Sequence, residues 1–174
     1  MPKLSKSEIE TYQNKGYVIP DYKVPESVLR SLKEALEETL NINANIRPEQ
    51  LASIHTEKSS ADDTVGHSTF LKTALNSELV DLVSSVLGDN IIMWGVQVFC
   101  KPGVDGMEVP MHQDGQYWPI RPLKTCTMWL ARDDADRDNG CLQVIPGSHL
   151  GSIHYGHQKE TRDKLVLNQS IKDP

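Results

Sequence analysis

The residues in this chain most suited to chemistry are a histidine and an aspartate in the segment 110–115, which reads Pro-Met-His-Gln-Asp-Gly. In an extended strand, side chains two positions apart point to the same face, so His112 and Asp114 can converge on one point. An imidazole and a carboxylate are two of the three ligands in the 2-His-1-carboxylate sites that hold non-haem Fe(II). The spacing alone is weak evidence, because a surface histidine paired with a carboxylate gives the same pattern.

The composition limits the classes of protein to consider. The chain has 174 residues and a net charge of -6, with 38% hydrophobic and 24% charged residues, which is ordinary for one globular domain. The acidic balance argues against nucleic acid as a partner, and no apolar run reaches the roughly 18 residues of a membrane span. Cys100, Cys126 and Cys141 show no C-x-x-C spacing, which predicts reduced thiols. We therefore expect a cytoplasmic protein.

Helices are expected to form the first half of the scaffold. Ser5 and Glu8 have the S-x-x-E spacing of a capping box, and Gly16 is placed to end the helix that they start. Pro25 opens a second helix that reaches about residue 40, and the apolar spacing predicts a third helix over 77–87.

Strands are expected mainly in the second half. The β-branched and aromatic content predicts strands over 91–99, 125–131 and 141–145, after a short strand at 17–19. The polar stretch 41–68 reads as a long connection, and such connections are more often functional or mobile than inert. Helices followed by strands predict an α+β fold, with helices packed on an antiparallel sheet or barrel.

Further motifs stand in register with the His-x-Asp pair. Trp129 ends the run Thr-Cys-Thr-Met-Trp at 125–129, and residues 138–149 read Asp-Asn-Gly-Cys-Leu-Gln-Val-Ile-Pro-Gly-Ser-His. With His112 and Asp114, these motifs resemble the phytanoyl-CoA dioxygenase family of non-haem Fe(II), 2-oxoglutarate-dependent oxygenases. The segment 7–19 is also similar to the family's opening helix and strand, so the resemblance covers nearly the whole chain.

The resemblance implies a fold and a site. The fold is a double-stranded β-helix (jelly-roll, cupin-like) core with the N-terminal helices packed on it. His112 and Asp114 correspond to iron ligands, while Gln113 and Trp129 match positions that line the 2-oxoglutarate pocket. A plain core aromatic is an equally good interpretation of Trp129. Gln97 matches another pocket position less securely, and a polar residue of a sheet is the simpler interpretation.

The resemblance also implies a reaction. Its small-molecule partners are an organic substrate, O₂ and the co-substrate 2-oxoglutarate, which becomes succinate and CO₂ as the substrate is hydroxylated. Relatives act on acyl-CoA thioesters, amino acids and alkyl phosphonates, so the substrate itself is not predicted. Lys58 is a distant match to a co-substrate lysine, and Arg121 could bind an anionic substrate group. A solvated loop lysine is the simpler interpretation of Lys58, and a loop arginine in a surface ion pair explains Arg121 at least as well.

The chain departs from the family in its last third. The family's third iron ligand is a later histidine, followed by an arginine that pairs with 2-oxoglutarate, and neither motif is present. His149 belongs to a structural turn of the family, while His154 and His157 fall in a variable loop. We therefore expect a single domain over 1–174 that lacks a C-terminal segment, with a jelly roll incomplete at its C-terminal strands. Unpaired edges of such a sheet invite self-association.

Two classes of function stay open at this point. In the first, the parent protein is a hydroxylase and this chain carries two of its three iron ligands. In the second, the short form is a catalytically inactive binding or interaction protein that keeps part of the jelly roll. A cupin-like metal enzyme independent of 2-oxoglutarate shares the architecture but does not account for the string at 138–149.

Overall fold

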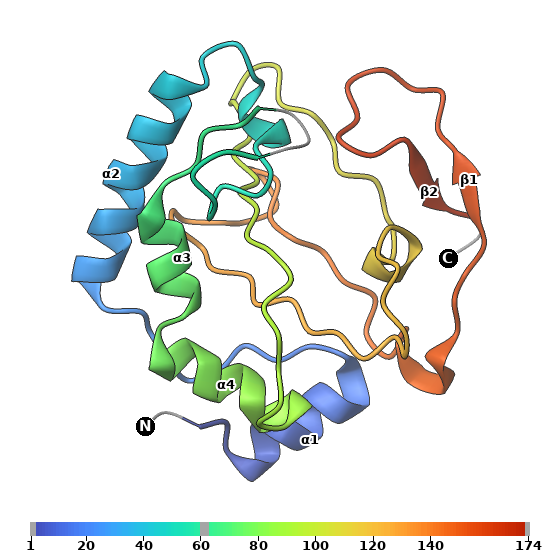
Figure 1. Cartoon of the computed structure of the whole chain (residues 1–174). Coiled ribbons are helices and arrows are strands. Elements are labelled where there is room, and N and C mark those ends of the chain that lie inside the picture. Colours follow the sequence, from blue (N-terminus) through green and yellow to red (C-terminus); the bar gives the residue numbers. More distant parts are fainter. Residues whose placement is uncertain (1–2, 60–62, 173–174) are drawn as a thin grey trace.

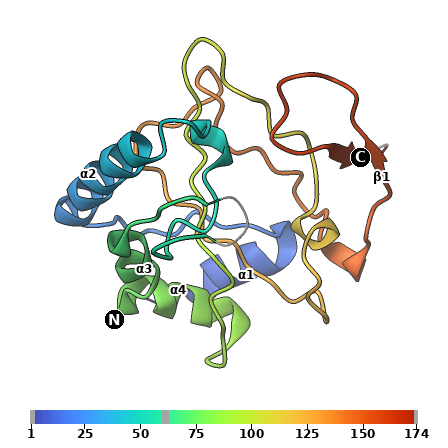
Figure 2. The same ribbon diagram turned by 45° about the horizontal axis from the view of Figure 1, so that its top comes forward.

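The computed structural model describes residues 3–59 and 63–172. In chain order the elements are α1 (Lys6–Lys15), α2 (Glu26–Ile42), η1 (Pro48–Gln50), α3 (Ser68–Ala74), α4 (Ser77–Leu87), η2 (Asp114–Gln116), η3 (Leu150–Ser152), β1 (His157–Lys159) and β2 (Gln169–Ile171). The α-helices lie along one flank, extended segments cross the middle, and the β1–β2 hairpin lies on the opposite side (Figures 1 and 2).

Three of the helices have the ends that local sequence signals predict. In α1 the Ser5 hydroxyl accepts the Glu8 N–H while the Glu8 carboxylate accepts the Ser5 N–H, and Gly16 ends the helix at a φ of 82°. The helix α2 begins directly after Pro25, and α4 has the predicted bounds. Such caps fix helix ends because they satisfy backbone groups that have no partner within the helix.

The described residues of the stretch 41–68 form the predicted connection, which leads from α2 to α3, and they pack on the core. Leu51 and Ile54 within it are fully buried in the core. The Asn43 side chain at its start accepts the N–H of Val65 at 2.9 Å and donates to the Val65 carbonyl at 2.8 Å. The apolar residues of this stretch are too few to show a helical or strand periodicity in the sequence, but their burial holds the stretch against the core.

The sequence does not predict α3, which follows this stretch. Its N-cap is His67, an uncommon capping residue, whose Nδ1 accepts the Thr69 N–H at 3.2 Å. The other ring nitrogen lies 3.3 Å from the Glu38 carboxylate on α2. Phe70 of α3 is buried in the core. This short helix is therefore stabilised mainly by tertiary contacts, with His67 as its cap.

Two apolar clusters join the helices to the rest of the chain. The larger unites α2 and α3 with the stretch between them, and its buried members are Leu32, Ala35, Leu36, Leu51, Ile54 and Phe70. The smaller lies between the N-terminal segment and α4, and its buried members are Leu4, Leu79 and Leu82. Burial of each leucine, isoleucine or phenylalanine side chain contributes about 1.5–3 kcal/mol.

The predicted strands at 17–19, 91–99, 125–131 and 141–145 are not hydrogen-bonded strands in the described part of the chain. Side chains alternate over residues 96–98, since Val96 and Val98 pack on the larger cluster while Gln97 between them is exposed. The backbone there pairs only through an isolated bridge between Ala52 and Gln97. Alternation needs only an extended backbone, whereas a strand also needs a partner for its N–H and C=O groups.

The only strands among the described residues are β1 and β2, which pair antiparallel with His157 opposite Ile171. The structure is thus mixed helix with a small sheet, and it does not confirm the jelly roll that the resemblance implies. No helix in the described ranges combines the length and apolar character that a membrane crossing requires.

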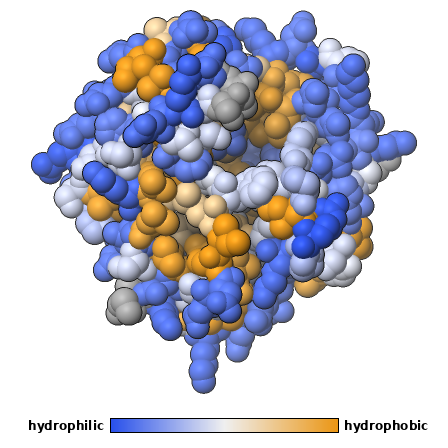
Figure 3. Space-filling view, viewed as in Figure 1, coloured by the Kyte–Doolittle hydropathy of each residue, from blue (hydrophilic) through white to orange (hydrophobic). Residues whose placement is uncertain are grey.

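Because the extended segments lack partners, many of their large apolar side chains are exposed. They include Ile92, Trp94, Phe99, Trp129, Leu142 and Val144. Figure 3 shows apolar surface in the central part of one face, surrounded by hydrophilic residues. Contiguous apolar surface of this kind commonly marks a place where other atoms pack.

Candidate functional site

The structure brings His112 and Asp114 together. Gln113 between them is extended, with φ −115° and ψ 131°, and η2 begins directly at Asp114. The two flanking side chains therefore share one side of the backbone. His112 Nε2 lies 3.2 Å from Asp114 Oδ1, as the spacing of the two residues predicts.

The other ring nitrogen of His112 is held by the backbone. Nδ1 lies 2.8 Å from the carbonyl oxygen of Pro110, a buried residue. A carbonyl can only accept, so Nδ1 carries a hydrogen and Nε2 is the nitrogen presented to Asp114. Histidine ligands of metal ions are commonly fixed in this way, with one ring N–H bonded to a carbonyl and the other nitrogen toward the metal.

Asp114 has a different partner on each oxygen. Oδ1 faces His112, while Oδ2 accepts the hydroxyl hydrogen of Thr127 at 3.0 Å. The side chains of His112 and Asp114 are 23% and 41% exposed. The pair is therefore positioned by protein contacts and still open to solutes.

The hydrogen bond between the two side chains shifts both of their pKa values. It raises the pKa of His112, against the effect of burial and with help from the Pro110 carbonyl. It lowers the pKa of Asp114, again against burial and with help from the Thr127 hydroxyl. Both shifts favour an imidazolium–carboxylate pair, and a metal cation would take the place of the Nε2 proton because only neutral imidazole binds metal.

Gln113 points to the opposite side of the same backbone. Its side-chain amide donates to the Ile153 carbonyl at 3.0 Å and accepts the Tyr155 N–H at 2.9 Å. Its backbone N–H donates to His157 Nε2 at 3.2 Å. Both polar atoms of the Gln113 side chain therefore hold the segment that leads into β1, on the face away from His112 and Asp114.

The two later histidines lie beside this segment. The rings of His154 and His157 stack with centroids 5.6 Å apart. Both nitrogens of His157 are engaged, since Nδ1 pairs with the Tyr155 carbonyl at 3.0 Å and Nε2 accepts from Gln113. Within residues 3–59 and 63–172, no group of three or more His, Cys, Asp or Glu side chains could hold a metal ion.

The His112–Asp114 pair forms no hydrogen bond or ion pair with the other predicted site residues in the described part of the chain. Trp129 is 44% exposed, and Gln97 is exposed on the segment that bridges to the stretch 41–68. Lys58 is an exposed side chain that forms an ion pair with Asp63 at 2.9 Å. Arg121 donates to the carbonyl of the residue before it.

Sequence reasoning missed Thr127, although a signal for it exists. The residue lies two positions before Trp129 on a segment predicted to be extended, so the two side chains are expected on one face. Since Trp129 was expected at the site, the Thr127 hydroxyl could have been expected there too. The Pro110 carbonyl carries no sequence signal, because every residue has one.

The Pro-Gly-Ser-His turn at the end of the 138–149 string is structural. The Gly147 N–H donates to the Lys15 carbonyl at 2.9 Å, and His149 Nε2 donates to the Gln13 carbonyl at 2.8 Å. These are carbonyls in the last turn of α1 that lack partners within the helix. The turn thus fastens the second half of the chain to the end of α1.

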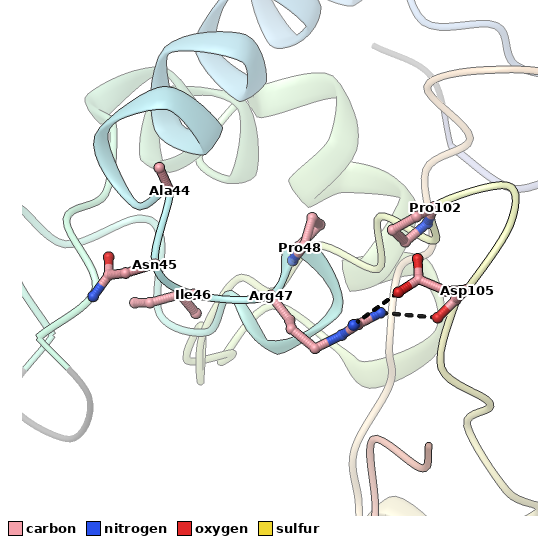
Figure 4. Close-up of a pocket in the computed structure, with 7 residues that line it drawn as sticks. All are labelled: Ala44, Asn45, Ile46, Arg47, Pro48, Pro102 and Asp105. Atoms are coloured by element: carbon pink, nitrogen blue, oxygen red, sulfur yellow. Dashed lines mark hydrogen bonds and ion pairs between the residues drawn. The ribbon is translucent and has the colours of Figure 1, made fainter. Parts of the chain in front are cut away.

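A separate hollow of about 260 Å³ lies beside the end of α2, lined by residues 44–48 with Pro102 and Asp105 (Figure 4). Figure 4 shows the Arg47 side chain reaching toward Asp105, which it binds at 3.2 Å. Arg47 also binds the buried Glu49 at 3.0 Å. Two carboxylates neutralise this guanidinium, so the hollow is no anion site.

Comparison with known proteins agrees with the motif evidence. The family model for phytanoyl-CoA dioxygenase (PhyH) matches residues 12–170. Human peroxisomal phytanoyl-CoA dioxygenase is 38% identical over an alignment of 81 positions that covers 44% of this chain and 24% of the human protein. A probable phytanoyl-CoA dioxygenase of Caenorhabditis elegans is 38% identical over an alignment of 82 positions that covers 43% of this chain and 26% of the relative.

A plant relative matches over a longer range. The phytanoyl-CoA dioxygenase of Arabidopsis thaliana is 24% identical over an alignment of 189 positions, gaps included, that covers 86% of this chain and 66% of that protein. The matched region thus spans about a quarter of the animal relatives and about two thirds of the plant one. No solved structure is significantly similar to the chain. The family model, the relatives and the converging His112 and Asp114 lead to one conclusion: the chain belongs to the phytanoyl-CoA dioxygenase family.

Proposed function

We propose that this chain is part of an Fe(II)- and 2-oxoglutarate-dependent hydroxylase and binds the metal through His112 and Asp114. The observation that carries the proposal is the convergence of His112 Nε2 and Asp114 Oδ1 at 3.2 Å, with the far side of the imidazole fixed by Pro110. Imidazole and carboxylate are the ligand types of facial-triad iron sites. The residues present therefore fit two of three ligands.

The contribution of these residues follows from their contacts. The Pro110 carbonyl selects the tautomer that presents Nε2, and the Asp114 carboxylate supplies negative charge beside it. When bound, Fe(II) with 2-oxoglutarate and O₂ supplies the oxidising power to hydroxylate a C–H bond, and 2-oxoglutarate leaves as succinate and CO₂. The protein's own task is to hold the ligands and to place the carbon to be oxidised.

The co-substrate residues and the complete fold rest on the family match. We propose Gln113, Trp129 and Gln97 as residues near 2-oxoglutarate, and a cupin-like core as the fold that unites them. For Gln113 this requires an exchange of partners, because its amide now binds Ile153 and Tyr155. The proposed substrate is a small organic molecule, and the names of the relatives make acyl-CoA thioesters the first class to assay.

A second candidate is a binding protein without catalysis. It is favoured by the lack, among the described residues, of a third metal-ligating side chain beside His112 and Asp114. In that case the exposed apolar surface of the extended segments would carry the function.

That surface and the unpaired backbone also support self-association as a proposal. The free thiols of the three cysteines support a reducing compartment, such as the cytoplasm.

The proposal is tested by measuring succinate formation from 2-oxoglutarate in the presence of Fe(II) by NMR. The protein assayed is the longest natural polypeptide that contains this chain. We expect His112→Ala and Asp114→Ala to abolish succinate formation, and His154→Ala, which alters an exposed histidine outside the pair, to retain it. Unchanged turnover in the first two variants would refute the role of the pair. No succinate and no metal binding in the unmodified protein would favour the second candidate.

A further inference from the structure

Thr127 is placed to decide which oxygen of Asp114 faces the metal. Its hydroxyl lies 3.0 Å from Oδ2, while Oδ1 lies 3.2 Å from His112 Nε2. A hydroxyl that bonds a carboxylate must donate, because an ionised carboxylate only accepts. The two oxygens of Asp114 are thereby made different: one is held by a neutral donor and the other is directed to the imidazole.

We infer that Thr127 is a positioning residue that holds Asp114 in one rotamer, with Oδ1 as the single metal-facing oxygen. The inference rests on the proposed function, since it presumes that His112 and Asp114 bind a metal ion. It goes beyond that function because it assigns a role to Thr127, a residue outside the His-x-Asp motif.

Conformational freedom makes such a contact useful. An aspartate χ1 has three staggered states and its χ2 is broad, so a partly exposed carboxylate samples many orientations unless it is held. Asp114 is 41% exposed and follows an extended residue at the start of a short helical turn, which leaves it few local constraints. A hydrogen bond from a separate segment, thirteen residues later in the chain, supplies one.

Threonine suits this role better than serine or a longer side chain. Its β-branch restricts χ1, so the hydroxyl stays where the backbone directs it. A hydrogen bond to an ionised acceptor is stronger than one between neutral groups. Outer contacts that orient a metal ligand typically change metal affinity by about 10–100-fold when they are removed. Because Asp114 is partly exposed, we expect the lower end of that range, about tenfold.

Three variants separate this role from a structural one. Thr127→Val removes the hydroxyl but keeps the shape, and Thr127→Ser keeps the hydroxyl. Thr125→Val is the matched control, since Thr125 lies two residues earlier on the same segment and its hydroxyl makes no hydrogen bond within the described residues. The first measurement is the affinity for Mn(II), a redox-stable stand-in for Fe(II), from paramagnetic broadening of the amide signals near His112.

The second measurement needs no metal: scalar couplings that report χ1 of Asp114. We expect Thr127→Val to weaken Mn(II) binding about tenfold and to average the couplings. Thr127→Ser should fall between Thr127→Val and the unmodified protein in both measurements, and Thr125→Val should change neither. Unchanged affinity and couplings in Thr127→Val would overturn the inference while the proposed function stands. If the unmodified chain does not bind Mn(II), the proposed function and the metal-facing role of Oδ1 fall together. The couplings would still decide whether Thr127 holds Asp114.

Discussion

Replacing Gly16 with alanine tests how the second half of the chain is fastened to α1. Gly16 ends the helix at a φ of 82°, a conformation that costs an L-residue about 1–2 kcal/mol. A Cβ at this position would lie 2.5 Å from Nδ1 of His149, closer than such atoms can approach. The ring would have to move, and its hydrogen bond to the Gln13 carbonyl would weaken.

The two effects set the size of the change. The backbone cost and the loss of a hydrogen bond worth about 0.5–1.5 kcal/mol together predict that Gly16→Ala lowers the free energy of unfolding by about 1.5–3.5 kcal/mol. For a domain of this size, that corresponds to a fall of about 3–14 °C in Tm. In a His149→Ala background the steric part disappears, and we expect Gly16→Ala to cost only the backbone part, about 1–2 kcal/mol.

The double-mutant cycle consists of the unmodified protein, Gly16→Ala, His149→Ala and the double variant. Urea denaturation of these four proteins gives the coupling free energy between the two sites. Gly103→Ala is the control, because a Cβ there meets no atom within 4 Å and the residue has no positive φ. If Gly16→Ala lowers the free energy of unfolding equally with and without the His149 side chain, then the His149 ring does not clash with a Cβ at position 16. A cost under about 0.5 kcal/mol, the range of ordinary surface changes, would refute the backbone argument as well.

Two further predictions concern a buried carboxylate and the exposed segments. Burial alone would raise the pKa of Glu49, but bonds from Arg47 and the Met107 N–H lower it overall. The stability that Glu49 contributes is therefore present above its unfolded pKa and lost as pH falls through the lower folded pKa. In urea titrations, Glu49→Gln should be less stable than the unmodified protein at pH 7, with a gap that shrinks below about pH 4.5; a constant gap would contradict this. Sedimentation velocity should show concentration-dependent association that Ile92→Asp reduces and Val104→Asp, an equally exposed loop change, does not; equal effects would contradict a role for the extended segments.

Local sequence signals were sufficient for most of the helical scaffold. The capping box of Ser5 and Glu8, the glycine after α1 and the apolar spacing of α4 all act within a few residues. Such signals predict helix ends because a helix makes its hydrogen bonds within itself. The helix α3 escaped prediction because its cap is a histidine and its stability comes from Phe70 in the core.

Alternation between core and solvent occurs at residues 96–98 of one predicted strand, whereas none of the four predicted strands forms a hydrogen-bonded ladder among the described residues. The alternation of Val96, Gln97 and Val98 between core and solvent follows from an extended backbone, which the residue types favour. Hydrogen-bonded ladders depend on a second segment at the right distance and register, and a window of sequence holds no such information. The complete cupin-like core therefore stays a prediction from the family.

At the site, sequence and tertiary structure contribute different parts. The convergence of His112 and Asp114 was determined by the sequence itself, because an extended residue between two side chains sets them on one face. The same alternation turned Gln113 away from them, but its partners in the segment 153–155 were decided only by the fold. The contact of Thr127 with Asp114 is likewise tertiary, because the two residues lie on segments that only the folded chain brings together.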